Sequence, residues 1–201
     1  SQTDYTGYMA DIYTTDANNQ QTIYATIGVD VSSDWARFPR YGFIASYGND
    51  RTSDVIASEL SLLNRCHING LQFYDWQYKQ HWPLGGTPDN LLENYKDIAN
   101  RDNYTSVVKD YIAQAHSFGM KAMFYNLCFG VFDDAKADGV GDHWYIYTDQ
   151  NHSKCDRHQL PSDWKSDIYL VNPSNKDWQN YLADRNDDVY KALDFDGFHI
   201  D

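Results

Sequence analysis

The sequence predicts a parallel α/β fold of the (β/α)8 TIM-barrel type, with only the first half of the barrel present. Three observations support this: strand-like and helix-like segments alternate, the strands are short apolar runs, and the loops differ in length on the two sides of each strand. Loops from a helix to the next strand are short, whereas loops after the second and third strands are long. Long loops at the carboxyl ends of strands are typical of barrels, where they build the site.

The chain opens with two segments that read as β-strands, residues 5–13 and 22–31. Both are rich in β-branched and aromatic residues, and the connector 14–21 is rich in turn-forming Asp and Asn. Two strands form a hairpin, and an isolated hairpin is only marginally stable in water. We therefore expect this pair to belong to a larger sheet or to pack on the residues after it.

Four short, largely apolar runs are the expected strands of the barrel. They cover residues 40–47, 68–74, 120–127 and 198–201, with a further short extended piece at 168–172. An eight-unit barrel needs about 250 residues, so we expect the chain to be part of a longer one. A doubly wound sheet is the alternative, although no GxGxxG motif follows the first strand.

Three helical stretches separate these strands. In the first, residues 55–66, Ile56, Leu60 and Leu63 recur at helical spacing and form one apolar stripe. The second covers residues 104–118 and is expected to stop at Gly119. The third covers residues 177–193. The alternation of these helices with the strands is what favours parallel strand pairing.

The composition narrows the functional classes. A net charge of −13 argues against nucleic-acid binding, because phosphate neutralisation needs Lys and Arg. The 17 Tyr, 6 Trp and 9 Phe residues suit sugar binding, although aromatic rings also fill cores. No apolar run has membrane-spanning length. The three cysteines are scattered and indicate neither a zinc site nor a disulfide framework.

Polar residues stand at the tips of three expected strands: Asp75, then Tyr125 and Asn126, then His199 and Asp201. Residues two apart in a strand share a face, so His199 and Asp201 should point the same way. Carboxylates, an amide, an imidazole and aromatic rings on adjacent tips make a plausible sugar-binding floor. Asp201 would then be the nucleophile or base of a glycosidase, with a second carboxyl group as the acid.

Each of these residues also has a purely structural interpretation. Asp75 fits a helix cap or a turn, Asn126 fits a partner for loop backbone groups, and His199 fits a hydrogen-bonded core histidine. The His199-x-Asp201 pair could also ligate a metal. A metal site needs three or four ligands, and the sequence offers no second His pair at suitable spacing, so we predict no metal and no cofactor.

Specific stretches resemble family 66 glycoside hydrolases, the endo-dextranases and cycloisomaltooligosaccharide glucanotransferases. Residues 29–42, with the run Val-Asp-Val-Ser-Ser-Asp-Trp, are similar to the segment that enters the barrel in that family. Residues 69–76, together with His81, resemble the second-strand motif. Residues 195–201, Phe-Asp-Gly-Phe-His-Ile-Asp, resemble the strand that carries the nucleophile. The resemblance runs through most of the chain, in order and at sensible spacing.

The resemblance implies retaining cleavage or transglycosylation of α-1,6-linked glucan. Asp201 would match the nucleophile, whereas the general acid of the family is a Glu on a later strand, beyond this chain. Residues 1–35 would be the last strands of an immunoglobulin-like β-sandwich, and residues 36–201 the first half of the catalytic barrel, ending at the fourth strand. The residues implied to line the glucosyl site are Asp75, Trp76, His81, Tyr125, Asn126 and His199.

Three functions remain open on the sequence alone. The first is a dextranase-type hydrolase, the second a cyclising glucanotransferase of the same family, and the third a non-catalytic glucan-binding surface protein. In each case the expected partner is an α-glucan polysaccharide or oligosaccharide. The expected location is secreted, cell-surface or periplasmic.

Overall fold

The computed structural model describes residues 3–201 and divides the chain into two compact units, Ser1–Arg40 and Tyr41–Asp201. The sequence places the corresponding boundary after residue 35, five residues earlier. Residues 1–2, which the sequence assigns to the first domain, lie outside the described residues.

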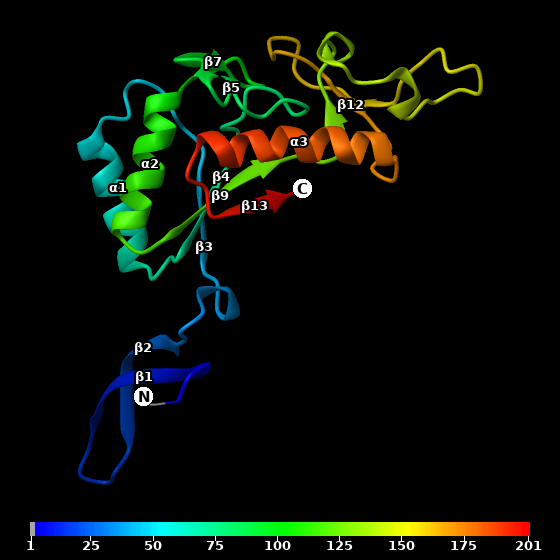
Figure 1. Ribbon diagram of the computed structural model, residues 1–201. Coiled ribbons are helices and arrows are strands. Elements are labelled where there is room, and N and C mark those ends of the chain that lie inside the picture. Colours follow the sequence, from blue (N-terminus) through cyan, green and yellow to red (C-terminus); the bar gives the residue numbers. More distant parts are fainter. Residues whose placement is uncertain (1–2) are drawn as a thin grey trace. The chain divides into compact units, whose positions relative to one another are not determined.

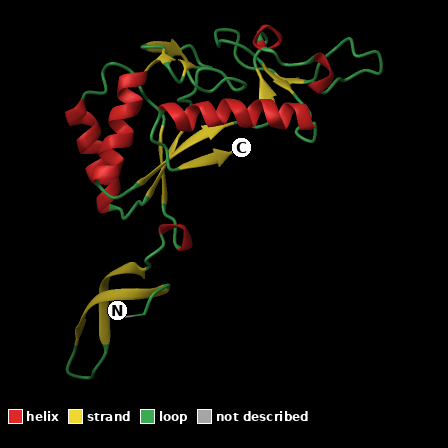
Figure 2. Cartoon of the chain, in the orientation of Figure 1, coloured by secondary structure: helices red, strands yellow, loops and turns green. Residues whose placement is uncertain are grey.

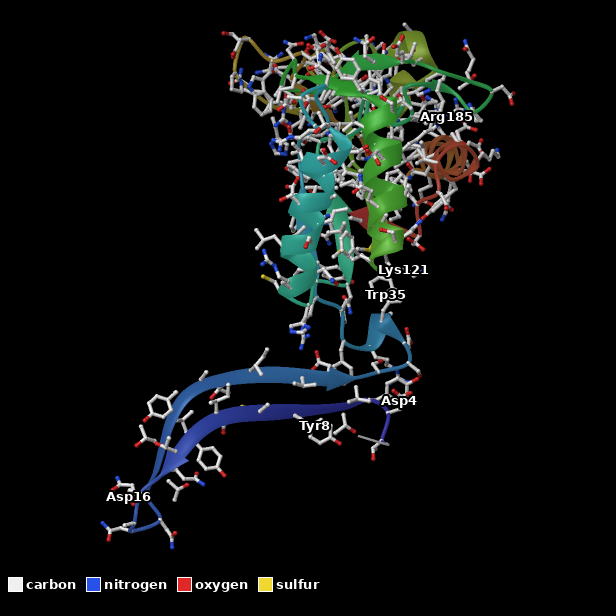
Figure 3. All side chains as sticks on the ribbon, turned by 90° about the vertical axis from the view of Figure 1, so that its left-hand side faces the viewer. Asp4, Tyr8, Asp16, Trp35, Lys121 and Arg185 are labelled. Carbon is white, nitrogen blue, oxygen red and sulfur yellow. The ribbon has the colours of Figure 1, made fainter. Side chains whose placement is uncertain are left out.

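The first unit consists mainly of a long antiparallel hairpin, as the sequence predicts. Strand β1 (Thr6–Thr15) pairs with β2 (Gln21–Val31), and the register shifts at a bulge between Ile12 and Tyr13. Nearly every residue of both strands is exposed, and Figure 3 shows the Tyr8 side chain projecting from β1. A short 3-10 helix, Trp35–Arg37, follows the hairpin.

The second unit is built on a four-stranded parallel sheet (Figure 1). Its strands are β3 (Tyr41–Ile44), β4 (Gly70–Phe73), β9 (Lys121–Asn126) and β13 (Gly197–Ile200). They lie side by side in the order β13-β9-β4-β3, and every pairing is parallel. The prediction of a parallel α/β arrangement is therefore confirmed, and the strands lie side by side in the order in which they occur along the chain.

Three helices connect these strands: α1 (Ser53–Arg65), α2 (Thr105–Ser117) and α3 (Lys176–Ala192). Thr52 and Asn175 cap the amino ends of α1 and α3 with side-chain oxygens. Gly119, with φ of 73°, terminates α2 in the left-handed region that glycine adopts without strain. No helix within residues 3–201 is long and apolar enough to cross a membrane.

The two faces of the sheet differ in what covers them. On one face, which we call the covered face, the strand residues pack against the three helices in one apolar core. Its strand residues are Ile44, Leu71, Phe73, Ala122, Phe124 and Phe198. The alternate residues form the open face, where Tyr41 and Phe43 are 47% and 57% exposed. Strand β9 is buried on both faces from Ala122 to Asn126, as expected for a parallel sheet, whereas the edge strand β3 is buried on the covered face only.

The two long connections follow β4 and β9, and each holds small strands rather than plain loop (Figure 2). The first connection contains two antiparallel pairs, β5 (Gly86–Thr87) with β6 (Asn90–Leu91), and β7 (Asn94–Lys96) with β8 (Asp102–Tyr104). The second contains β10 (Gly130–Val131), β11 (Arg157–His158) and β12 (Ile168–Leu170) in a separate antiparallel sheet. Two 3-10 helices, Ala135–Asp138 and Asp142–Trp144, lie between β10 and β11. The extended piece expected at 168–172 is therefore outside the main sheet.

Candidate functional site

Asp201 and Tyr125 meet at the carboxyl ends of β13 and β9. The register pairs His199 with Tyr125, which brings the residue after β13 level with the end of β9. The Tyr125 hydroxyl donates to Asp201 Oδ2 at 2.8 Å. The backbone of Asp201 is also held, because its N–H donates to the Asn126 carbonyl and its carbonyl accepts from the Cys128 N–H. The carboxylate therefore has a defined position at the edge of the sheet.

The environment of this pair keeps Tyr125 protonated. Tyr125 is 4% exposed, and burial, together with the hydrogen bond and charge of Asp201, raises the pKa of its phenol well above the usual range. Burial and the charge of Asp201 likewise raise the pKa of Cys128 to about 11. Tyr125 is thus a permanent donor at neutral pH, and the neighbouring thiol is not a competing nucleophile.

A group of rings on the open face packs around Tyr125, the partner of this carboxylate. The ring of Tyr74 lies 4.6 Å from that of Tyr125, and the ring of His199 lies 5.3 Å from it. Phe43 extends the group, with its ring 5.9 Å from His199. Tyr74 and Phe43 are 38% and 57% exposed, so they present flat apolar surface to a ligand. His199 Nδ1 is buried and has no hydrogen-bond partner among residues 3–201.

Asp75 occupies the tip of β4 in an unusual conformation. Its φ of 52° lies in the left-handed region, which few non-glycine residues adopt. Arg101 donates to its Oδ2 at 2.7 Å, and Asn103 donates to its backbone carbonyl at 2.8 Å. Burial outweighs the Arg101 pair and raises the pKa of Asp75 above its ordinary value. The charges of Asp75 and Asp201 both add to the effect of burial in raising the pKa of Tyr74, so both carboxylates lie near this ring.

Asn126 does not join this group, although the sequence places it with Tyr125 at a strand tip of the expected sugar-binding floor. Its side chain is fully buried and donates to Asn186 of α3 at 3.3 Å. The physical reason is the alternation of side chains along a strand, since neighbours such as Tyr125 and Asn126 point to opposite faces. Only the backbone of Asn126 contacts Asp201.

Trp76 and His81 are also buried and serve structural contacts. Trp76 is 1% exposed, packs its ring against Phe124 and Phe195, and donates from Nε1 to the Tyr125 carbonyl at 3.0 Å. It therefore supports the backbone of Tyr125 from the covered side.

The imidazole of His81 joins the two long connections. It is fully buried, its Nδ1 accepts from the Phe132 N–H, and its Nε2 lies 2.9 Å from Asp138 Oδ2. Burial lowers the pKa of His81. In this structure neither His81 nor Trp76 exposes a ring face to solvent, and a direct sugar contact for either stays a prediction.

Some residues next to the site could have been predicted from sequence patterns, and others could not. Tyr74 and Phe43 could have been found by counting alternate positions back from the strand tips, because both share the open face with Tyr125. The partnership of Asp75 with Arg101 joins residues 26 positions apart through an irregular connection. No spacing rule predicts such a contact.

Among residues 3–201, one group of side chains has the composition of a metal site: His81, Asp134 and Asp138. However, the ammonium group of Lys79 lies 2.6 Å from a carboxylate oxygen of both Asp134 and Asp138. The lysine already supplies the positive charge that a metal would bring. This group is therefore an ion-pair cluster that ties the two long connections together.

Comparison with known proteins places this geometry in a family. The sequence model that describes glycosyl hydrolase family 66 matches residues 1–201, and the chain belongs to that family. A cycloisomaltooligosaccharide glucanotransferase of Niallia circulans is 30% identical over 203 residues, and a dextranase of Streptococcus salivarius is 27% identical over 207 residues. Both alignments cover 99% of this chain, which spans only 20% and 25% of those two relatives.

A solved structure shows the same arrangement. The crystal structure of a Paenibacillus cycloisomaltooligosaccharide glucanotransferase, complexed with cycloisomaltoheptaose, superposes with a TM-score of 0.83 at 31% identity. The match covers 98% of this chain and 28% of that one. The mixed α/β fold with its parallel sheet is thus that of a family 66 glucanotransferase.

Proposed function

We propose that this chain is part of a retaining glycoside hydrolase that cleaves α-1,6-linked glucan, with Asp201 as the nucleophile. The observation that carries the proposal is the Asp201 carboxylate at the carboxyl edge of a parallel sheet, held by Tyr125, whose ring packs against those of Tyr74 and His199. Membership of family 66, and relatives named as a dextranase and a glucanotransferase, support the substrate class.

The architectural part of the proposal concerns the whole enzyme. We propose that the four sequential parallel strands are the first half of a (β/α)8 barrel, with the open face toward the barrel interior. The β1–β2 hairpin would belong to an immunoglobulin-like β-sandwich. The sequential strand order and the long connections after β4 and β9 support the barrel, since a barrel site forms at the carboxyl ends of its strands.

The proposed reaction has two displacements. A carboxylate oxygen of Asp201 attacks the anomeric carbon, the glycosidic C–O bond breaks, and the departing oxygen receives a proton from a general acid. Water or a sugar hydroxyl then displaces Asp201, so the anomeric configuration is retained. The Tyr125 hydroxyl donates a hydrogen bond to Asp201 Oδ2. This bond orients the carboxylate and leaves Asp201 Oδ1 for the attack.

We place the general acid outside these 201 residues. A retaining enzyme needs a second carboxyl group about 5–5.5 Å from the nucleophile. Asp75 is the other carboxyl near Tyr74. Burial raises its pKa, but its Oδ2 is already occupied by the hydrogen bond from Arg101, and the left-handed turn at this residue fixes that pairing, so we do not assign it the role of acid. We therefore expect the 201-residue piece on its own to release no reducing sugar from dextran.

Substrate binding would use the residues on the open face. Tyr74, Phe43 and His199 are placed to contact a glucosyl unit, and Asp75 to accept hydrogen bonds from its hydroxyls. For Trp76, His81 and Asn126 we propose supporting roles through Tyr125, the long connections and α3, respectively. Because the proposed substrate is a polysaccharide, we also propose a secreted, cell-surface or periplasmic location.

A cyclising glucanotransferase is the second candidate. The observation that favours it is the higher identity to the Niallia circulans glucanotransferase, 30%, than to the Streptococcus salivarius dextranase, 27%. Both enzymes would share the first displacement at Asp201. Product analysis separates them, because a hydrolase yields linear sugars and a cyclising transferase yields rings without a reducing end.

The test of the proposal is Asp201→Asn in the full-length protein. The variant keeps the shape of the side chain but loses its charge and nucleophilicity, so turnover of dextran should fall by about three orders of magnitude or more while glucan binding persists. Asp89→Asn, at an exposed loop position, is the control and should keep wild-type turnover. An Asp201→Asn enzyme that retains more than about a tenth of wild-type turnover rules out the nucleophile, because tenfold is only about 1.4 kcal/mol of barrier.

A further inference from the structure

Asp196 stands at the amino end of β13, five residues before Asp201, and makes more polar contacts than its position suggests. Its Oδ1 accepts from Lys121 Nζ at 2.7 Å. Its Oδ2 accepts from the Ala122 N–H at 2.9 Å and lies 2.7 Å from His116 Nε2. Lys121 begins β9 (Figure 3), and His116 lies in the last turn of α2, so one carboxylate joins three elements.

The backbone of Asp196 completes this contact. Its N–H donates to the Ala122 carbonyl at 2.7 Å, so Asp196 binds both the N–H and the carbonyl of a single β9 residue. The regular ladder starts one step later, with Gly197 opposite Met123. Asp196 thereby defines which residue of β9 faces the start of β13.

This alignment matters because the register of β13 on β9 decides where Asp201 lies relative to Tyr125. A slip of one residue would transfer every β13 side chain to the other face and turn Asp201 toward the helices. A slip of two would keep the face but move Asp201 by about 6.6 Å along the strand. In either case the hydrogen bond from Tyr125 to Asp201 would be lost.

We propose that Asp196 is a positioning residue that sets the register of β13 on β9 and so holds Asp201 against Tyr125. The proposal rests on the proposed function in one respect, that Asp201 is the nucleophile. Asp196 itself lies at the opposite end of β13 and does not touch substrate.

The electrostatic environment of Asp196 agrees with this role. Burial works to raise the pKa of Asp196, but hydrogen bonds from Lys121, Ala122 and His116 outweigh it and hold the pKa below its usual value. The Asp196 side chain is 19% exposed, whereas that of nearby Asp194 is 93% exposed. The Oδ2 atom of Asp194 lies only 3.6 Å from His116 Nδ1, so Asp194 offers a matched control of the same residue type.

The first test is structural and does not depend on activity. In a crystal structure of the full-length Asp196→Asn variant, we expect the Tyr125 hydroxyl and the Asp201 carboxylate to be separated by more than 3.5 Å, beyond hydrogen-bond range. In the wild type and in Asp194→Asn, the bond should be present. An Asp196→Asn structure with this bond intact and β13 in the same register overturns the proposal, whatever the enzyme does.

The second test is kinetic and uses the same variants at a temperature where all are folded by circular dichroism. Asp196→Asn should lower kcat on dextran by about tenfold or more with KM within about twofold, because a displacement of only about 1 Å can already cost a hundredfold. Asp194→Asn should stay within about twofold of wild type. A lower melting temperature with an unchanged kcat would mean that Asp196 only stabilises the fold, and would overturn the proposal.

Two further variants keep the result decisive. If Asp196→Asn does not fold, Lys121→Gln can be used instead, because it removes one hydrogen-bond partner of Asp196 and the Lys121 side chain is 41% exposed. We expect a smaller loss of kcat in this variant, about three- to tenfold. An unchanged kcat in Lys121→Gln then counts against the proposal. Asp201→Asn separates the two ideas: if it keeps wild-type activity, the proposed nucleophile is wrong, while the Tyr125–Asp201 distance in Asp196→Asn still decides the positioning role.

Discussion

The covered face and the open face are formed by the same four strands, yet they have different chemistry. Phe73 and Phe124 on the covered face are fully buried against the helices. Tyr74 and Tyr125, each the next residue along the chain, point to the open face beside Asp201. One step along a strand therefore changes a side chain from core packing to the candidate site.

The difference explains why residue type alone is a poor guide to function here. Trp76 and Asn126 have the side chains expected at a sugar site, but both point into the packed side of the sheet. Phe43, with no polar atom, lies on the open face next to His199. The direction of the side chain, and not its chemistry, separates the two groups.

The largest expected effect is a difference in the free energy of unfolding between two Phe→Ala variants on neighbouring strands. Phe73→Ala removes a fully buried ring from the core and should lower the free energy of unfolding by about 3–5 kcal/mol. In the 201-residue chain, Phe43→Ala removes a ring that is 57% exposed and should cost about 1 kcal/mol or less. Urea unfolding of both variants measures this contrast, and equal losses would show that the two faces are not distinct in packing.

The next effect concerns activity rather than stability. Tyr125→Phe keeps the ring on the open face but removes the hydroxyl that donates to Asp201. A hydrogen bond to a charged group contributes about 1.5–3 kcal/mol, so kcat should fall between about tenfold and a hundredfold with little change in KM. Steady-state kinetics on dextran measure it, and a kcat equal to wild type would mean that Tyr125 does not orient the carboxylate.

The smallest effect concerns the ion-pair cluster of His81, Asp134, Asp138 and Lys79, which joins the two long connections beside the apolar packing of the second one. Burial works to raise the pKa of Asp138, but hydrogen bonds from Lys79 and His81 outweigh it, and the pKa is lowered from 3.8. A carboxyl group with a depressed pKa stabilises the fold fully above pH 3.8, and the contribution is lost as the pH falls through its folded value.

Asp138→Asn should therefore lower stability at pH 6 by about 1 kcal/mol and flatten the decline below pH 3.8. Melting temperatures of wild type and variant between pH 6 and pH 3 measure the effect. The two curves should converge at the acid end. Parallel curves would show that the Asp138 cluster does not contribute in the way proposed.

The sequence predicts the regular elements of the second unit well, because strong local patterns determine them. The stripe of Ile56 and Leu60 identifies α1, Gly119 ends α2, and the short apolar runs give the four parallel strands. The spacing of His199 and Asp201 predicts that both side chains point the same way, and in the structure both contact Tyr125.

The long connections could not be predicted in the same way. Contacts such as those between Asp75 and Arg101, or between His81 and Asp138, join distant residues through irregular backbone, where no periodicity applies. Asn126 was within reach of sequence reasoning, since counting alternate positions from Tyr125 puts it on the covered face. The role of Asp196 depends on the register between β9 and β13, which the sequence alone does not specify.

The central claim is that Asp201 forms a covalent bond to the sugar, and trapping that bond tests it most directly. The full-length enzyme would be incubated with an activated 2-fluoroglucosyl substrate, which slows the second displacement, then digested and analysed by mass spectrometry. We predict one added fluoroglucosyl mass on the peptide that contains Asp201 and none in Asp201→Asn. A label on a different carboxylate, in an enzyme that cleaves with retention, would contradict the assignment of Asp201 as the nucleophile.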